Sequence, residues 1–532
     1  MSNKTKLELT WIGKDNPPKL EPRILIEDPE SSYVADKKIT GHDLIDNRLI
    51  FGDNLLALKA LEDEFTGKIK CICIDPPYNT GNAFEKYDDG IEHSLWLNLM
   101  RARLEILYKL LSDDGVIFVN IDESEHAYLK VMMDSIFSRE NFIGDLIWKK
   151  RKGGGNDSRF LALDHEYILV YVKNKQKHLN KWRIGYDEKY LKRYKEQEED
   201  GRRYYWDTLS RPGLQNPIIF SYKCEDGEEL KIFSQKSEAT FYSELEKGNI
   251  RVVKTRNGWT AHHKVYMPQD GKVLRSILDE HGINNDAANE MLSIFGSKKA
   301  FDYPKPEKLI MTLLDLVTEK GDWVLDSFAG SGTTGAVAHK MGRKWIMIEL
   351  GDHCHTNIIP RLQKVISGED QSGITKIVDW KGGGGFRYFR LAPSLLEKDK
   401  FGNWIISKQY NPAMLAEAMC KLKGFIYQPD DTLFWKQGQS TETDYIFTTT
   451  QLVTRELVDR IQEQMGENET LLICCKAFTV SQMDYPTITF EKIPSTILKS
   501  CEYGRDDYSL DIREIEQEEI QEKGLEGMRN NE

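Results

Sequence analysis

The chain has 532 residues, of which 40% are hydrophobic and 30% are charged, and its formal net charge is −12. This composition is typical of a soluble protein, and the length predicts about two to four domains. The sequence has no apolar run long enough for a membrane helix, no secretory leader and no Cys-x-x-Cys pair among its eight cysteines, so we expect a cytoplasmic protein with reduced thiols and no bound metal.

A first chemical motif, Asp75-Pro76-Pro77-Tyr78, directly follows a predicted strand at Ile69–Ile74. Ligands of open α/β sheets bind at this end of a strand. The two prolines keep the backbone extended and leave their carbonyls free as acceptors. Upstream, Asp53 precedes a predicted helix at Asn54–Leu61 and is a natural N-cap for it.

These residue types suit the alkylation of an aromatic amine, which is a poor nucleophile because its lone pair is delocalised into the ring. If the Asp75 carboxylate and the Pro76 carbonyl accept the two amine N–H groups, the nitrogen can become pyramidal and direct its lone pair at an electrophile. A base in duplex DNA reaches such a pocket only when it is flipped out, and Tyr78 would then stack on it.

The segments that follow predict alternating helices and strands: a helix at Leu95–Leu111, a strand at Gly115–Ile121, a helix at Ser124–Phe137 with Ser124 as a candidate cap, and strands at Leu146–Trp148 and His165–Val172. This alternation predicts a doubly wound, mostly parallel α/β sheet.

Basic residues gather between the last two of these strands and beyond them. From Lys149 to Lys223 there are 18 Lys/Arg and 10 Asp/Glu, whereas Cys501 to Glu532 holds 4 and 11. Lys149, Lys150, Arg151 and Lys152 begin a glycine-rich loop that could clamp DNA phosphates, and the alternative is a solvated loop.

The regular α/β pattern stops from about Lys173 to Asn289, a segment that mixes aromatic and basic residues. Arg202 and Arg203 precede Tyr204-Tyr205-Trp206 there, as expected of a surface that contacts bases and phosphates. The alternative is a solvated face. His262-His263 has no partners at metal-ligand spacing, so we expect no metal site here.

A second motif follows a predicted strand that ends at Asp326, and it contains Phe328, Gly330, Gly332 and Thr333. A helix at Thr333–Lys340 and a strand at Lys344–Glu349 come next, and the strand ends in an acid that is well placed for ribose hydroxyls. No lysine follows the glycines, which argues against a phosphate-binding P-loop and favours a cofactor without phosphate.

The two motifs together resemble the amino-methyltransferases that act on DNA. The resemblance implies a Rossmann-like fold, S-adenosyl-L-methionine as cofactor, and catalysis by Asp75, Pro76, Pro77 and Tyr78. It also implies that the Phe-x-Gly-x-Gly loop holds the methionine part, that Lys305 and Glu307 close over the cofactor, and that Asp53 lies near its adenine. The catalytic motif precedes the cofactor motif, which is the order of the β class, and Asp75 favours adenine over cytosine as the target.

Two flanking stretches, Leu9–Lys14 and Gly382–Leu391, are similar to the modification subunits of type III restriction-modification systems. We expect double-stranded DNA as substrate, a homodimer, and a separate helicase-nuclease restriction subunit as a further partner. Two alternatives remain: a cytosine-N4 methyltransferase, and a non-catalytic DNA-binding specificity subunit.

Five regions are predicted. They are an N-terminal extension (1–40), the catalytic half of the methyltransferase domain (41–172), a target-recognition domain (173–290), the cofactor-binding half (291–380) and a C-terminal domain (381–532) whose last part, 396–532, reads as a small α/β fold with an acidic tail.

Overall fold

The computed structural model describes residues 8–36, 44–78, 89–153, 160–178, 182–186, 188–210, 214–267 and 271–508. The end of the catalytic loop at 79–81, the basic loop at 154–158 and the acidic tail beyond 508 lie outside these ranges. The chain divides into two compact units, one of residues 1–180 with 275–532 and the other of residues 181–274. The target-recognition region expected at 173–290 encloses the second unit.

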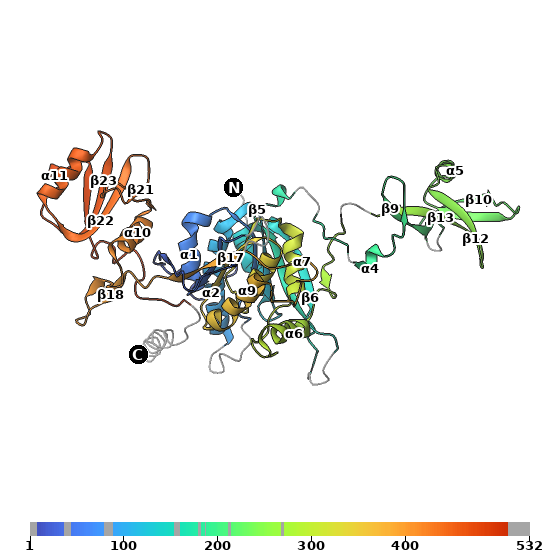
Figure 1. Cartoon of the computed structure of the whole chain (residues 1–532), viewed down its shortest axis with the longest axis horizontal. Coiled ribbons are helices and arrows are strands. Elements are labelled where there is room, and N and C mark those ends of the chain that lie inside the picture. Colours follow the sequence, from blue (N-terminus) through green and yellow to red (C-terminus); the bar gives the residue numbers. More distant parts are fainter. Residues whose placement is uncertain are drawn as a thin grey trace, which may run out of the picture. The chain divides into compact units, whose positions relative to one another are not determined.

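The first unit, in which Figure 1 labels β5, β6 and β17, is built on an 11-stranded sheet. The strand order is β1-β17-β3-β16-β15-β4-β5-β7-β6-β14, with β2 paired to β17. The strands from β17 to β5 in this order are parallel, whereas β7 is antiparallel to β5 and β6. The bounds are β1 Leu25–Glu27, β2 Tyr33–Val34, β3 Asn47–Phe51, β4 Ile69–Ile74, β5 Leu111–Ile121, β6 Phe142–Lys149, β7 His165–Val172, β14 Ile277–Leu278, β15 Trp323–Asp326, β16 Lys344–Glu349 and β17 Gly385–Leu391.

Helices cover both faces of this sheet. One face, with Ile72 and Ile346, shares a hydrophobic core with α1 (Asn54–Phe65), α2 (Asp89–Leu110) and α3 (His126–Met133). Strand alternation turns Met347 to the opposite face. There it lies against Gly335 of α8 (Thr333–Lys340), which packs with α7 (Glu307–Val317) and α9 (Ile359–Ser367). The doubly wound, mostly parallel sheet predicted from the sequence is therefore confirmed.

Two helix N-caps, Asp53 and Ser124, were predicted from the sequence, and the structure confirms only the first. Asp53 is the N-cap of α1, where its Oδ1 accepts a hydrogen bond from the Leu56 amide at 3.0 Å. The prediction for Ser124 was wrong: α3 begins at His126, and its N-cap Glu125 makes no capping side-chain bond. The Ser124 amide instead donates to the Asp122 carboxylate in a tight turn before the helix.

The second unit has a four-stranded sheet in the order β12-β13-β9-β8 and a β10–β11 hairpin. Phe241 of α5 packs there on a small core with Ile232, Ile250 and Ala261. The bounds are α4 Glu188–Leu191, β8 Glu196–Gln197, β9 Arg203–Thr208, β10 Ile218–Lys223, β11 Glu229–Ser234, α5 Glu238–Glu246, β12 Ile250–Thr255 and β13 Gly258–Tyr266. The chain enters and leaves it side by side, because Ile184 and Lys272 exchange two backbone hydrogen bonds of 2.9 Å.

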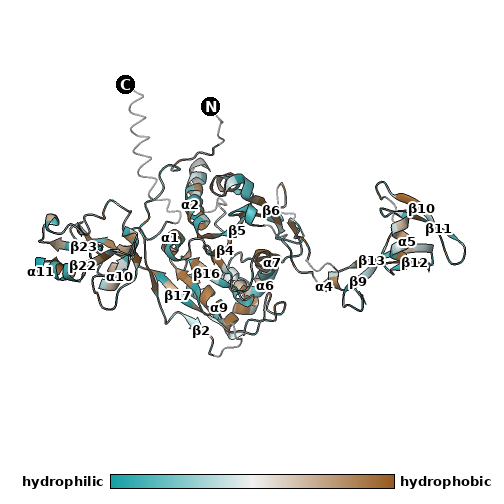
Figure 2. Ribbon diagram, turned by 90° about the horizontal axis from the view of Figure 1, so that it is seen from above, coloured by the Kyte–Doolittle hydropathy of each residue, from teal (hydrophilic) through white to brown (hydrophobic). Residues whose placement is uncertain are grey.

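The C-terminal part holds a five-stranded mixed sheet in the order β20-β21-β22-β23-β24 and a β18–β19 hairpin. Its helix α11 is mainly hydrophilic (Figure 2). The bounds are β18 Leu396–Lys398, β19 Trp404–Ile406, α10 Pro412–Lys423, β20 Ile426–Tyr427, β21 Gly438–Gln439, β22 Asp444–Val453, α11 Arg455–Gln464, β23 Thr470–Phe478 and β24 Ile488–Lys492. A further helix of the first unit, α6, spans Asn284–Phe295.

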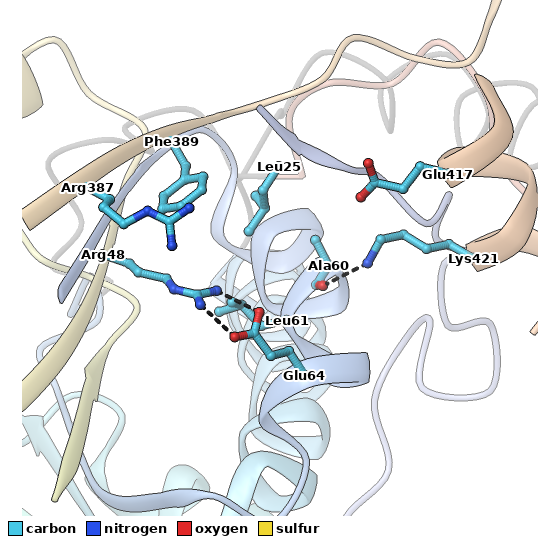
Figure 3. A pocket seen from close by; sticks show the side chains of 9 residues that line it. All are labelled: Leu25, Arg48, Ala60, Leu61, Glu64, Arg387, Phe389, Glu417 and Lys421. Carbon is cyan, nitrogen blue, oxygen red and sulfur yellow. Dashed lines mark hydrogen bonds and ion pairs between the residues drawn. The ribbon is translucent and has the colours of Figure 1, made fainter. Parts of the chain in front are cut away.

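A small cavity of about 280 Å³ lies where α10 meets α1 and the strands β3 and β17 (Figure 3). Arg48 forms a two-pronged ion pair with Glu64 there, and Lys421 donates to the Ala60 carbonyl at 3.3 Å. Because Lys421 also pairs with Asp63 at 3.0 Å, α10 is attached to α1 through polar contacts. None of the helices in the described ranges is both long and apolar enough to cross a bilayer.

Candidate active site

Four acidic residues stand at the same edge of the large sheet. Asp53 follows β3, Glu349 ends β16, Asp326 ends β15 and Asp75 follows β4, and these four strands are adjacent and parallel in this order. The carboxyl ends of parallel strands share one edge, and the connection changes direction between β15 and β4, which is where ligands of such sheets bind. The two sequence motifs therefore meet although about 250 residues separate them.

A cavity of about 520 Å³ opens at this edge. It is lined by residues of both motifs and by basic residues from the end of β6. The predicted site residues that line it are Asp75, Pro76, Pro77, Tyr78, Lys150, Arg151, Lys305, Asp326, Phe328, Gly330 and Thr333. Tyr78 and Phe328 thus lie on one cavity.

Asp75 and Tyr78 belong to a compact polar cluster. The Tyr78 hydroxyl donates to Asp75 Oδ1 at 2.7 Å, and the Lys305 ammonium donates to Asp75 Oδ2 at 2.7 Å and to the Tyr78 oxygen at 2.9 Å. Glu166 of β7 lies 3.1 Å from the same hydroxyl and 3.3 Å from the same ammonium. The loop itself is held by Trp96, whose indole N–H donates to the Pro77 carbonyl at 2.7 Å.

Burial and charge set the protonation of this cluster. Burial, together with the carboxylates of Asp75 and Glu166, raises the pKa of Tyr78 well above its usual range, so its hydroxyl stays a donor. Burial acts to lower the pKa of Lys305, but the same two carboxylates outweigh it and raise that pKa, so the ammonium stays charged.

The glycine-rich loop is fixed by carboxylates of the neighbouring strands. Asp326 Oδ1 accepts from the Phe328 amide at 3.0 Å and Oδ2 accepts from the Thr334 hydroxyl at 2.6 Å, while Glu349 Oε2 accepts from the Gly330 amide at 2.8 Å. Burial raises the pKa of Asp326 to about 7. A carboxyl with this pKa beside a cavity is suited to hold a cationic ligand, whose charge would favour the ionised form.

Gly330 and Gly332 have φ values of +53° and +75°, which other residues adopt only with strain. A Cβ at Gly332 would lie 3.1 Å from Ile358 Cγ2. The glycines therefore allow the loop to turn tightly into α8 while it packs closely against Ile358, the residue before α9.

Four residues predicted to hold the cofactor do not line the cavity: Gly332, which forms the turn into α8, and the acids Asp53, Glu349 and Glu307. Asp53 is 1% exposed, and its Oδ2 accepts from the Tyr508 amide at 2.9 Å. Glu349 is tied to the backbone of its own turn and to His353 at 3.0 Å, and these contacts lower its pKa although burial opposes them. Glu307 is wholly buried.

The expectation that Glu307 closes over the cofactor needs correction. Its carboxylate accepts from Lys340 Nζ at 2.8 Å and from Arg361 at 3.0 Å, and all three side chains are 0% exposed. Since Lys340 ends α8 and Arg361 lies on α9, Glu307 ties three helices together behind the glycine loop. Lys305, two residues earlier, contacts Asp75 and Tyr78.

The predicted DNA-contacting residues fall in both units. Lys150 donates to Glu166 Oε1 at 3.2 Å beside the cavity, whereas Lys149 and Lys152 are exposed and do not line it. In the second unit, Arg202 is exposed, forms an ion pair with Asp200 and lies over the Tyr266 ring. The Arg203 guanidinium donates a hydrogen bond to the Tyr194 carbonyl at 2.7 Å. Within the ranges described, no group of three His, Cys, Asp or Glu side chains is arranged to bind a metal.

Several lining residues were missed from the sequence, among them Asn120, Glu166 and Tyr303. Glu166 is a charged residue in the otherwise apolar strand His165–Val172, and Asn120 is a polar residue in the buried strand before Ile121. A lone polar residue in a buried strand was the signal that could have identified both. Asn120 donates to the Ile74 carbonyl at 3.0 Å, and its buried Oδ1 has no partner among the described atoms.

Comparisons with known proteins identify the family of the chain. A family model described as "DNA methylase" matches residues 69–359, more than half of the chain. The HindVI Mod subunit of a type III restriction-modification enzyme from Haemophilus influenzae is 34% identical over 436 residues, which is 68% of this chain and 57% of that one. The type II methyltransferase M.KpnI of Klebsiella pneumoniae is 30% identical over 61% of this chain and 85% of its own length.

A crystal structure of TTHA0409, a putative DNA modification methylase of Thermus thermophilus, is similar with a TM-score of 0.32 and 16% identity, over 64% of this chain and 97% of that one. The chain spans little more than half the length of the HindVI subunit. With the family match over both motifs and the relationship to M.KpnI, the chain belongs to the DNA methylase family.

Proposed function

We propose that the chain transfers a methyl group from S-adenosyl-L-methionine to the N6 amine of adenine in duplex DNA. The observation that carries the proposal is that Asp75, Pro76 and Tyr78 line the same cavity as Phe328 and Gly330.

In this proposal the catalytic loop acts by positioning. Asp75 and the Pro76 carbonyl accept the two N–H groups of the target amine, which frees the nitrogen lone pair to point across the cavity. The ring of Tyr78 stacks on the flipped base, and Pro77 is fixed by Trp96. Lys305 orients Asp75 through its 2.7 Å hydrogen bond.

The cofactor would occupy the part of the cavity beside the glycine loop. Asp326, Phe328, Gly330, Gly332 and Thr333 would hold its methionine part, since a buried carboxyl and close backbone suit a cationic amino acid. Glu349 would accept from the ribose and Asp53 would lie toward the adenine, because Glu349 ends β16 and Asp53 follows the adjacent strand β3 at the same edge. When bound, S-adenosyl-L-methionine supplies an electrophilic methyl group.

Double-stranded DNA would contact Lys149, Lys150, Arg151 and Lys152 near the cavity and Arg202 and Arg203 in the second unit, which would serve as the target-recognition domain. The likeness to the HindVI Mod subunit supports a role as the modification subunit of a type III system. We further propose that the chain acts in the cytoplasm as a homodimer, with a separate restriction subunit as its partner.

The test is transfer of a tritiated methyl group from S-adenosyl-L-methionine to unmethylated plasmid DNA by the purified chain. We expect incorporation with the wild type and at least about 1,000-fold less with Asp75→Ala, which removes the main acceptor of the amine. Cofactor binding by calorimetry should remain in this variant. Incorporation that is unaffected by Asp75→Ala would contradict the proposal.

A further inference from the structure

Glu166 is an acidic residue beside the catalytic loop to which no step of the proposed reaction has yet been assigned. It lies at the start of β7, which is antiparallel to β5, so that this end of β7 reaches the edge where β4 ends in Asp75. The residue is 7% exposed and lines the cavity. A buried carboxylate is costly unless it is paired, and here its partners are the groups that also hold Asp75.

Glu166 shares two partners with Asp75, the Tyr78 hydroxyl and the Lys305 ammonium. Its Oε2 lies 3.1 Å from the Tyr78 hydroxyl and 3.3 Å from Lys305 Nζ, and its Oε1 lies 3.2 Å from Lys150 Nζ. Burial acts to raise the pKa of Glu166, but the charges of Lys305 and Lys150 outweigh it and lower that pKa, so the residue is an acceptor.

A tyrosine hydroxyl has one proton, so it can donate to only one of the two carboxylates at a time. The shorter distance, 2.7 Å, is to Asp75 Oδ1. Lys305 donates to Oδ2 of the same carboxylate, also at 2.7 Å. Each carboxylate oxygen of Asp75 therefore already accepts a hydrogen bond from a strong donor. The target amine nevertheless needs one of these oxygens as its acceptor.

We propose that Glu166 is a positioning residue that accepts the Tyr78 hydroxyl when the target amine binds Asp75. The hydroxyl turns from Asp75 Oδ1 to Glu166 Oε2, where an acceptor is already within reach, and Lys305 stays between the two carboxylates. Asp75 Oδ1 is then available to the amine N–H, while the hydroxyl of the stacking ring keeps a charged partner. This inference rests on the proposed methyl transfer.

The test is the effect of Glu166→Gln on methyl transfer to plasmid DNA, measured with and without the Tyr78 hydroxyl. The charge that attracts the hydroxyl is lost in Glu166→Gln, so the hydroxyl stays on Asp75 and competes with the amine. We expect kcat to fall by about tenfold or more, the effect of one hydrogen bond to a charged group, while the Kd for S-adenosyl-L-methionine stays the same. In a Tyr78→Phe background the same substitution should change kcat far less.

Asp134→Asn is a matched control, because Asp134 also accepts from a lysine, Lys130 at 2.8 Å, and from a tyrosine hydroxyl, Tyr171 at 2.7 Å, but does not line the cavity. It should leave kcat unchanged. If Glu166→Gln fails to fold, Glu166→Asp serves instead, since its shorter side chain keeps the charge but loses reach, and kcat should fall as well.

Two results would overturn the inference while wild-type transfer remains intact. One is an unchanged kcat in Glu166→Gln, and the other is an equal loss in the Tyr78 and Tyr78→Phe backgrounds, since the effect would then not pass through the hydroxyl. Absence of transfer by the wild type would instead overturn the proposed function and this inference with it.

Discussion

Tyr78 lines the cavity and carries two groups that can be tested separately, an aromatic ring and a hydroxyl that bonds to carboxylates. Tyr78→Phe keeps the ring, so we expect DNA affinity to stay about the same. Tyr78→Ala removes the stacking surface, and a loss of roughly 1–3 kcal/mol would weaken binding of the target about 5–150-fold. Titration of a DNA duplex that contains the methylation site checks both. Equal weakening by the two variants would contradict the stacking role.

If Asp326 holds the cofactor as proposed, we expect cofactor binding to depend on pH. Burial raises its pKa to about 7, so the carboxyl is neutral in more acidic solution and must ionise to pair with a cationic ligand. Binding of the ligand therefore favours proton release, and affinity rises as pH increases through 7, by about tenfold from pH 6 to pH 8.

Calorimetry of S-adenosyl-L-methionine binding across this pH range measures the dependence. Asp326→Asn cannot ionise and should give a much flatter profile. The same slope in the variant would show that another group is responsible.

At the scale of elements, the turn into α8 depends on glycine. Gly332→Ala places a Cβ at φ +75° and 3.1 Å from Ile358, so we expect a loss of about 1–2 kcal/mol in the free energy of unfolding and weaker cofactor binding. Gly342→Ala is the matched control, because it has φ +74° at the other end of α8, away from the cavity. It should lose stability but bind the cofactor as the wild type does. Unchanged cofactor affinity in Gly332→Ala would count against the role of this loop.

The buried ion cluster of Glu307 ties α7 to α8 and α9. Glu307→Gln leaves Lys340 and Arg361 without a charged partner on α7, so we expect a loss of about 3–5 kcal/mol in the free energy of unfolding. Denaturant unfolding measures it, with the exposed Glu319→Gln as control. If Glu307→Gln has normal stability but no longer binds the cofactor, the result would instead support the contact between Glu307 and the cofactor that was predicted from the sequence.

The elements that frame the site could be predicted because each strand is a short apolar run that ends in a conspicuous residue. Ile69–Ile74, Trp323–Asp326 and Lys344–Glu349 have the expected bounds or nearly so. Glu166 could have been singled out as a polar residue in a buried strand, but its contacts with Tyr78 and Lys305 could not be predicted. They depend on the antiparallel pairing of β7 with β5, a contact between residues distant in sequence. The burial of Glu307 was missed for the same reason, since its partners come from two later helices.

The whole chain has a net charge of −12, and in the proposed function it binds DNA, an acidic polymer. We therefore expect local basic residues to govern its affinity for DNA. Lys149→Ala and Lys152→Ala should each weaken binding to all DNA sequences alike. Each should also reduce the slope of log K against log salt concentration by about one, the loss of one phosphate contact. Binding measured across a series of salt concentrations checks this. Lys376→Ala, an exposed lysine away from the cavity, is the control and should have no effect. An unchanged salt slope in both test variants would place the DNA elsewhere.

The proposed reaction requires the cavity to present a flipped adenine to a methyl donor, and nucleoside mass spectrometry of the methylated DNA identifies the product. Unmethylated plasmid is incubated with the purified chain and S-adenosyl-L-methionine carrying a deuterated methyl group, and the DNA is then digested to nucleosides. We expect deuterated N6-methyladenine with the wild type and at least about 1,000-fold less with Asp75→Ala. Label on the N4 amine of cytosine, or no label on any base, would contradict it.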